Sequence, residues 1–427
     1  MKLVNLVDPD QQVSFLQAVR IGLGRKQGLF FPEQWPQLPV ADLLKMPFVE
    51  RSGHILAALF DGELSLTETT AMVDHAFTFE APVVAVNERI SCLELFHGPT
   101  LAFKDFGARF MAQSLQKANA AAQQTHSTIV TATSGDTGAA VADAFFQQPG
   151  VRVVVLYPEG KVSPLQAQLF TTLGENVEAI AIKGDFDQCQ ALVKQVLSDQ
   201  PLCDQLHVNS ANSINISRLL AQVCYFFEAW AQLPEAQREQ TSIVVPSGNF
   251  GNVCAALIAV KMGLPVRRVI AATNSNDTVP RYLTSGQWQP NPTQATLSNA
   301  MDISAPNNWP RVANLLENDA KLREKFTSIA VDETQTCDAV RAMYRQGYLS
   351  EPHAAVAWSA FERLAAADEC GLIVGTAHPA KFADRVEAII EAPVALPARL
   401  QEVLEQPSKI TQMAADYAQL KNFLLRN

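Results

Sequence analysis

The chain has no stretch in which basic residues cluster, and acidic residues outnumber basic ones. Over 427 residues, 43 Asp and Glu stand against 33 Lys and Arg, which gives a formal net charge of −10. Nucleic-acid binding depends on Lys and Arg contacts to phosphates, so this composition argues against a nucleic-acid partner. An anionic ligand would have to be held by local donor groups, because the overall field of the protein repels it.

Paired cysteines are missing as well. The seven cysteines include no C-x-x-C pair, and their number is odd. This pattern argues against a disulfide framework and against a structural zinc site. An H-E-x-x-H spacing is also absent, so the sequence predicts no metal site. Without a G-x-S-x-G turn, it gives no sign of a serine nucleophile either.

Long hydrophobic runs are lacking. The first residues, MKLVNLVDPDQQVSF, place acids early and contain no apolar core of a secretory signal. No apolar run is long enough to cross a bilayer. Together with the unpaired cysteines, these absences predict a cytoplasmic protein with no membrane partner.

The sequence is rich in short apolar runs that alternate with helical stretches. Hydrophobic residues make up 48% of the chain and charged residues 18%, as in a globular protein. A run that is apolar throughout is typical of a strand covered on both faces. Repeated alternation of such strands with helices predicts parallel sheets in doubly wound α/β units. The expected strands are residues 128–133, 151–158, 177–182, 241–248, 266–274 and 371–377.

The pattern of apolar and polar residues changes along the chain and divides it into three parts. Residues 1–80 are expected to form a mostly helical N-terminal domain, and residues 391–427 a helical C-terminal tail. Residues 81–390 are expected to form the α/β region. Within it we expect a smaller unit at about residues 105–210 and a larger unit made from the remainder.

Small, hydroxylated and glycine residues follow several expected strands and precede a helix. The motifs are SGDTG (134–138), SGNFGN (247–252) and TAHPAKF (376–382). Ligands of doubly wound folds bind beyond the carboxyl ends of the strands, and N–H groups at a helix N-terminus favour an anion. SGNFGN is therefore a candidate phosphate loop, although an ordinary βα turn has the same composition. It matches neither the Walker loop nor the dinucleotide fingerprint.

Two further motifs leave alternatives open. In SGDTG, Ser134 or Thr137 either caps the following helix or helps to clamp an anion such as a substrate carboxylate. In NSINISR (212–218), the helix start is either capped by Ser213 or Asn215, or its Arg218 grips a phosphate. A cation opposes the helix dipole at that position, which hints at the second role.

Lys104 lies between two phenylalanines in HGPTLAFKDFGARF (97–110). A lysine in such a run commonly buries its stem and extends its ammonium group to water. Alternatively, a dry site lowers the pKa of the amine so that it can form a Schiff base. The spacing of the residues does not separate these alternatives.

Five motifs in this order, HGPTLAFKDFGARF, ATSGDTG, SANSINISR, VPSGNFGN and GTAHPAKF, resemble those of the threonine synthase family, in its bacterial and fungal branch. GLFFP near the N-terminus extends the resemblance over most of the chain. The resemblance implies the α/β architecture of fold-type II pyridoxal-phosphate enzymes: two doubly wound parallel-sheet domains with an added, mostly helical N-terminal domain.

The resemblance also implies roles for individual residues. Lys104 would bind pyridoxal 5′-phosphate covalently and act as the catalytic residue. Thr376 would face the pyridine nitrogen, and Asp136 would lie near the 3′-oxygen of the cofactor. The cofactor phosphate would be held by Gly248, Asn249, Phe250, Gly251 and Asn252. The substrate carboxylate would be held by Ser134, Gly135 and Thr137, and the substrate phosphate by Asn212, Ser213, Arg218 and, as a weaker candidate, Lys161.

This sequence departs from the family at two of these positions. Asn252 stands where the family commonly has an acid, and its amide can donate to a phosphate. Asp136 stands where many relatives have an asparagine, and this departure is shared by the bacterial and fungal branch.

The implied reaction converts O-phospho-L-homoserine and water to L-threonine and phosphate, the last step of threonine biosynthesis. A serine or threonine dehydratase of the same fold and a non-catalytic protein that binds the cofactor are the alternatives. The apparent second phosphate-binding site in NSINISR argues against the dehydratase. The complete set of motifs argues against the non-catalytic protein. The sequence leaves both a monomer and a homodimer open.

Overall fold

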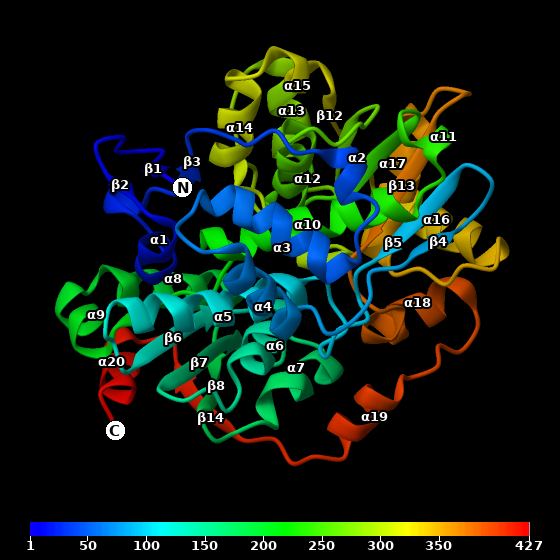
Figure 1. Ribbon diagram of the computed structural model, residues 1–427. Helices are drawn as coiled ribbons and strands as arrows, with labels where there is room; N and C mark the ends of the chain where they lie inside the picture. Colours follow the sequence, from blue (N-terminus) through cyan, green and yellow to red (C-terminus); the bar gives the residue numbers. More distant parts are fainter. Residues whose placement is uncertain (427) are drawn as a thin grey trace.

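The computed structural model describes residues 1–426 and contains two sheets of mainly parallel strands (Figure 1). The larger sheet has six strands in the order β12-β11-β10-β13-β5-β4. All neighbours are parallel except β4, which runs antiparallel to β5 at one edge. Its strands are β4 (Val83–Ala85), β5 (Ile90–Glu94), β10 (Thr241–Pro246), β11 (Val269–Thr273), β12 (Phe326–Ala330) and β13 (Cys370–Gly375).

The smaller sheet has five strands in the order β14-β8-β7-β6-β9, and every pair in it is parallel. These strands are β6 (Ser127–Ala132), β7 (Val151–Pro158), β8 (Val177–Lys183), β9 (Val208–Asn209) and β14 (Ile410–Ala414). The expectation of two doubly wound α/β units is confirmed. All six strands predicted from apolar runs are present, as β6, β7, β8, β10, β11 and β13.

Long helices connect the two sheets. Helix α10 (Ile216–Gln232) is buried along most of its length and packs against both α5 (Lys104–Ala121) and α12 (Gly251–Lys261). Figure 1 shows α10 and α5 at the centre of the molecule, with the smaller sheet below them and α12 above. The first residues of α5 and α12 therefore lie between the two sheets, at the strand ends where ligands bind in this fold.

The N-terminal part is mostly helical, as expected, but it also contains a small antiparallel sheet that the sequence did not reveal. The sheet has the order β2-β1-β3, formed by β1 (Leu3–Asn5), β2 (Gln12–Val13) and β3 (Phe30–Pro32). Strands of two or three residues are too short to show an alternating pattern. The helices include α1 (Phe15–Ile21), α3 (Phe48–Phe60) and α4 (Leu66–Ala76), and capping boxes at Ser14 and Ser65 begin α1 and α4.

The C-terminal part, expected to be helical, contains a strand as well as helices. Helices α19 (Ala398–Leu404) and α20 (Tyr417–Leu424) are present, but β14 lies between them and pairs with β8 at the edge of the smaller sheet. Only Met413 of this strand is buried. Such an exposed edge strand carries no apolar run, so it could not be predicted from the sequence. Within residues 1–426, no helix combines the length and apolar character needed to cross a membrane.

Candidate active site

The site is built where loops from both sheets meet. In the larger sheet, β10, β13 and β5 are adjacent, and their carboxyl ends lead into the 247–252 loop, Thr376 and the segment before Lys104. In the smaller sheet, β6 and β9 lead into the SGDTG and NSINISR loops. Two contacts join these sets: Asn249 Nδ2 donates to Ser213 Oγ at 2.6 Å, and Lys381 Nζ lies 2.6 Å from Asp136 Oδ1.

Backbone hydrogen bonds place Lys104 next to Thr376. Phe103 N donates to Thr376 O at 2.9 Å, and Ala102 pairs with Ala377 in an isolated antiparallel bridge. Lys104 follows directly as the first residue of α5. Lys104, expected to bind the cofactor, and Thr376, expected to face its ring, therefore lie side by side.

The surroundings of Lys104 favour a chemical role over an ammonium group extended into water. The side chain is half-buried, and burial lowers the pKa of its amine to about 8. The carboxylate of Asp136 opposes this shift, while the cations Lys381 and Arg218 add to it. A lysine with this pKa carries a useful neutral fraction near neutral pH.

Asp136 forms a buried ion pair with Lys381. Its Oδ1 also accepts from Gln166 Nε2 at 2.9 Å, and Lys381 Nζ donates to Thr100 O at 2.7 Å. Burial by itself would raise the pKa of Asp136, but the neighbouring ammonium groups of Lys381 and Lys104 bring it below its usual range. Sequence reasoning missed Lys381, because a lysine in TAHPAKF gives no sign that it is fully buried.

The SGDTG loop leaves its hydroxyl groups available. Thr133 Oγ1 accepts from Gly135 N at 2.9 Å and from Gly138 N at 2.8 Å, so neither Ser134 nor Thr137 caps helix α6 (Asp136–Phe145). The capping interpretation is therefore wrong, since the residue before the motif performs that task. Gly135 has φ +142°, a backbone conformation that would strain any other residue, and a Cβ there would also lie 2.7 Å from the side chain of Gln166.

The 247–252 loop is shaped to hold an anion. Phe250 precedes α12 with φ +59°, and the first backbone bond at this end runs from Cys254 N to Phe250 O at 3.1 Å. The N–H groups in the first turn of a helix have no helical partner and attract a negative charge. A Cβ on Gly248 would lie 2.5 Å from Met301 Cα, so this position requires glycine.

Asn252 adds an unused donor to this loop. Its Oδ1 accepts from the Tyr225 hydroxyl at 2.8 Å, while its Nδ2 is buried with no hydrogen-bond partner in residues 1–426. A buried donor left in this state is costly unless a ligand satisfies it. The position where the family commonly has an acid is thus equipped here to donate.

The NSINISR loop lies against the 247–252 loop. Ser213 Oγ contacts Asn249 as described above, and Asn212 Oδ1 accepts from Thr131 Oγ1. Asn215 caps α10 by accepting from Ser217 N at 3.2 Å, which was one of the two capping alternatives. The residue that caps the helix, Asn215, is therefore distinct from the residues of the same loop that are expected to bind the substrate phosphate.

Arg218 is buried near Lys104. Its Nη1 donates to Ala211 O, its Nε has no partner within the described chain, and it forms no salt bridge there. Burial lowers its pKa to about 10, and the nearby carboxylate of Asp105 opposes the shift. A guanidinium group in this situation is suited to an anionic ligand.

Lys161 lies farther out than the other expected substrate residues. It is exposed and lines a cleft of about 500 Å³ whose wall also includes Gln166, Asn299, Lys381 and Arg385. Because Gln166 and Lys381 both contact Asp136, the cleft adjoins the SGDTG loop. Lys161 is thus at its rim and makes no hydrogen bond to the other candidate residues.

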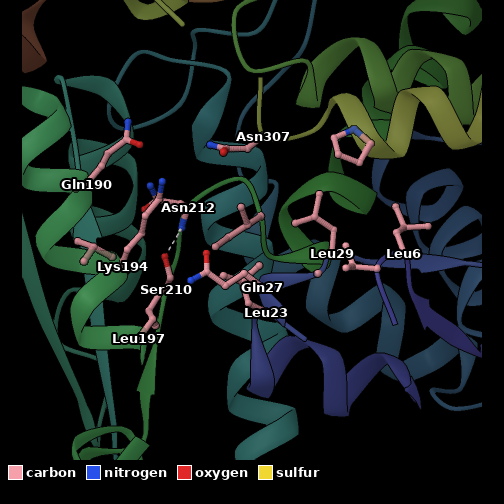
Figure 2. Close-up of a pocket in the computed structure, with 16 residues that line it drawn as sticks. Leu6, Leu23, Gln27, Leu29, Gln190, Lys194, Leu197, Ser210, Asn212 and Asn307 are labelled. Carbon is pink, nitrogen blue, oxygen red and sulfur yellow. Dashed lines mark hydrogen bonds between the residues drawn. The ribbon is translucent and has the colours of Figure 1, made fainter. Parts of the chain in front are cut away.

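A second cavity of about 230 Å³ lies beside the site (Figure 2). Figure 2 shows Gln190, Lys194 and Leu197 of α8 (Phe186–Ser198) on one side and Leu6, Leu23 and Leu29 of the N-terminal part on the other. Asn212 reaches its wall, where its backbone N donates to Ser210 Oγ at 3.4 Å. Neither Lys104 nor Thr376 lines it, so it is not where Lys104 acts.

Comparison with known proteins agrees with this arrangement. A family model described as pyridoxal-phosphate dependent enzyme matches residues 81–373, and one described as threonine synthase, C-terminal, matches residues 354–424. A threonine synthase of Serratia marcescens is 56% identical, with 100% of this chain and 99% of the relative covered.

Solved structures give the same result. The crystal structure of threonine synthase from Escherichia coli is 54% identical and superposes with a TM-score of 0.95, covering 100% of this chain and 99% of that one. A structure of threonine synthase from Brucella melitensis with bound pyridoxal phosphate is 32% identical, covers 99% and 98%, and has a TM-score of 0.92. The chain belongs to the threonine synthase family of pyridoxal-phosphate-dependent enzymes.

Proposed function

We propose that this protein converts O-phospho-L-homoserine and water to L-threonine and phosphate, with the residue roles given below. The observation that carries the proposal is the position of Lys104. Its amine has a pKa lowered to about 8, and it lies next to Thr376 and between donor loops of two separate sheets. Two donor-rich loops suit a reaction in which cofactor and substrate each bring a phosphate into an otherwise acidic protein.

The residues present fit pyridoxal phosphate. The unpartnered Asn252 Nδ2 and the first-turn N–H groups of α12 suit its phosphate, and Lys104 suits its aldehyde. The loop of Gly248, Asn249, Phe250 and Gly251 would enclose the phosphate, with Thr376 at the ring nitrogen and Asp136 near the 3′-oxygen. When bound, this cofactor supplies the electron sink that stabilises a carbanion beside its imine bond.

Lys104 would move the protons of the reaction. As a free amine, Lys104 would remove the proton at Cα of the substrate and then one at Cβ, so that phosphate could leave from Cγ. Water adds its oxygen at Cβ, and protons return to Cγ and Cα. The sum is phosphate released and one hydroxyl gained at Cβ, as threonine requires.

Other residues would orient the substrate. Ser134, Gly135 and Thr137 would hold the carboxylate: the hydroxyl groups of Ser134 and Thr137 would donate to it, and Gly135, whose own N–H donates to Thr133 Oγ1, would allow it to approach the backbone closely. Asn212, Ser213 and Arg218 would hold the phosphate, with Lys161 guiding it at the rim of the cleft. Arg218 has the buried position and the unused Nε that a phosphate contact needs.

The lowered pKa of Lys104 predicts how fast protein freed of cofactor captures it at different pH values. Only the neutral amine attacks an aldehyde, so the rate should rise about tenfold per pH unit up to about pH 8 and then level off. Stopped-flow absorbance between about pH 6 and about pH 10 would measure this. A rate that still rises tenfold per unit above about pH 9, as for a model lysine, would contradict the assigned environment.

Replacing Arg218 by alanine should mainly weaken substrate binding. Truncating one partner of a buried charge pair costs about 2–5 kcal/mol, so KM for O-phospho-L-homoserine should rise at least about thirtyfold. Cofactor affinity should stay within about twofold of the parent. Arg238→Ala is a matched control, because Arg238 also donates to a backbone carbonyl but lies beyond the far end of α10. An equal loss of cofactor affinity would assign Arg218 to the cofactor phosphate instead.

A product assay tests the proposal as a whole. The purified protein with pyridoxal phosphate would receive O-phospho-L-homoserine, L-serine or L-threonine in parallel. Equal amounts of threonine and phosphate from the first substrate are expected. Keto acid and ammonia from serine or threonine without phosphate release would make it a dehydratase, and no turnover despite bound cofactor would leave a non-catalytic role.

We further propose that the protein works in the cytoplasm, because all seven cysteines are free, as in a reducing compartment. Both a monomer and a homodimer are compatible with a site formed from loops of one chain.

A further inference from the structure

Arg311 is a buried arginine that the sequence analysis did not single out. It lies in the first turn of α14 (Trp309–Glu317), and its side chain is fully buried. Its hydrogen bonds run to backbone carbonyls and to one amide side chain, and none within residues 1–426 reaches a carboxylate. Burial lowers its pKa only to about 10, so the guanidinium group stays charged at neutral pH. A buried charge without a counter-charge is costly, which indicates a role beyond packing.

The guanidinium group of Arg311 joins three parts of the chain. Its Nε and Nη2 donate to Phe30 O, at 3.2 and 3.0 Å. Nη2 also donates to Ile214 O at 2.8 Å. Nη1 donates to Ser213 O at 3.4 Å and to Asn308 Oδ1 at 2.9 Å. Arg311 therefore connects β3, which contains the GLFFP motif, with the NSINISR loop and the residue before α14.

Arg311 determines how the amide of Asn308 is oriented. A guanidinium group can only donate, so the oxygen of the amide must face it. The nitrogen then faces the other way, where Asn308 Nδ2 donates to Ser213 Oγ and to Asn249 O, each at 3.2 Å. Rotating this amide would bring its N–H groups against those of Arg311 and its oxygen against the carbonyl of Asn249.

A second amide is fixed in the same way. Asn307 N, a backbone group that can only donate, is 2.7 Å from Asn249 Oδ1. Asn249 Nδ2 must therefore be the group that donates to Ser213 Oγ at 2.6 Å. Ser213 Oγ thus accepts two hydrogen bonds, which occupy both of its lone pairs. Its own proton has no acceptor within residues 1–426, so the hydroxyl group can offer a ligand only a donor.

A hydroxyl group that can only donate suits a phosphate, because phosphate oxygens accept hydrogen bonds. We propose that Arg311 is a positioning residue that, through Asn308, fixes the Ser213 hydroxyl as a donor to the substrate phosphate. The inference rests on the proposed function, in which Ser213 holds that phosphate. It also gives the N-terminal part a function, since Phe30 of the GLFFP motif holds the arginine that orients the substrate loop.

The test measures how tightly the holoenzyme binds inorganic phosphate, by calorimetry, and the KM for O-phospho-L-homoserine on the same samples. Ser213→Ala should weaken both at least about tenfold, because a hydrogen bond to a charged group is lost. Arg311→Lys keeps the charge but lacks the planar fork that holds Asn308 and the loop together. It should weaken both at least about fivefold, while kcat stays within about twofold of the parent.

A double variant shows whether Arg311 acts through Ser213. If it does, Arg311→Lys has little left to remove once Ser213 has lost its hydroxyl group. The double variant should therefore bind phosphate no more than about twofold more weakly than Ser213→Ala alone. Effects that multiply in the double variant would overturn the inference, as would parent affinity in Arg311→Lys.

Arg51→Lys is the matched control. Arg51 is also buried and donates to backbone carbonyls, those of Leu43 and Met46, but it contacts neither phosphate loop. The variant should keep the parent KM and phosphate affinity. A loss equal to that of Arg311→Lys would reduce the role of Arg311 to general packing.

Asn308→Asp tests the same inference if Arg311→Lys does not fold. One carboxylate oxygen still accepts from Arg311, while the other takes the proton of Ser213, so phosphate binding should weaken at least about tenfold. Asn307→Asp adds the same charge one residue away, where the side chain forms no hydrogen bond with Ser213, and should weaken binding less than about threefold. Equal losses in the two variants would show an effect of charge alone and overturn the inference.

These measurements separate the inference from the proposed function. If the parent protein forms threonine and phosphate but Arg311→Lys keeps the parent KM, only the role of Arg311 fails. If phosphate affinity changes as expected but the parent does not convert O-phospho-L-homoserine, the role of Arg311 in holding a phosphate stands and the proposed function fails.

Discussion

A Lys104→Ala variant is expected to lose turnover of O-phospho-L-homoserine by roughly 10⁴-fold or more, because one amine serves as covalent anchor and as acid and base. The fold should persist, since Lys104 is only half-buried and forms no salt bridge in the described structure. Cofactor should still bind through its phosphate. Borohydride reduction followed by intact mass measurement should show cofactor attached to the parent protein and not to the variant.

Lys117→Ala is the control for this experiment. Lys117 lies on the same helix, where it is exposed and pairs with Glu68 at 3.3 Å. Its removal should change neither turnover nor covalent attachment. A Lys104→Ala variant that keeps turnover near the parent rate, or that still retains cofactor after reduction, would assign the anchor to another lysine. Lys381 would be the first alternative, because its charge acts on Lys104 within the same site.

Asp136→Asn should destabilise the protein by about 3–5 kcal/mol, because it leaves the buried ammonium group of Lys381 without its counter-charge. Lys381 is 0% exposed and Asp136 is 4% exposed. Urea unfolding of the holoprotein, followed by a probe in the smaller sheet, would measure the loss. The double variant Asp136→Asn with Lys381→Met should recover much of it, because no buried charge remains unpaired.

An exposed pair provides the comparison. Asp42 and Lys45 are 70% and 76% exposed and lie 3.1 Å apart, so Asp42→Asn should cost at most about 1 kcal/mol. A similarly small loss of unfolding free energy for Asp136→Asn would mean that water or another group compensates the charge of Lys381. The buried pair would then contribute little to stability.

The pH dependence of this pair follows from the lowered pKa of Asp136. A carboxyl group whose pKa is lowered on folding stabilises the folded state fully above its unfolded value of 3.8. That contribution declines as the pH falls below this value towards the folded pKa. The difference in stability between parent and Asp136→Asn should therefore be constant from neutral pH down to about pH 4 and shrink only in stronger acid.

The sequence predicted the elements that its apolar runs mark. Strands such as β7 (Val151–Pro158) are buried on both faces, and their sequences consist almost wholly of apolar residues. Strand β14 lies at a sheet edge with one buried residue, and β9 has two residues, so neither leaves a pattern to detect. Both join the smaller sheet from distant parts of the chain, and pairing of that kind is decided by tertiary contacts.

The site was predictable where chemistry depends on short motifs. The loop of residues 247–252 and the lysine before Asp105 were identified from residue types and from resemblance. Lys381 was missed, because its importance comes from its burial and from Asp136, a partner far away in sequence. Thr133 was likewise overlooked as the residue that stabilises the SGDTG loop, since a hydroxyl before the motif looked like the end of a strand.

The central claim is that phosphate leaves from Cγ while water adds at Cβ, and conversion in water enriched in oxygen-18 tests it most directly. Mass spectrometry of the products should find one heavy oxygen on Cβ of threonine and none in the released phosphate. Heavy oxygen in the phosphate would mean that water attacks phosphorus, as in a phosphatase. In that case Lys104 would not move the protons, and the proposed reaction would be wrong.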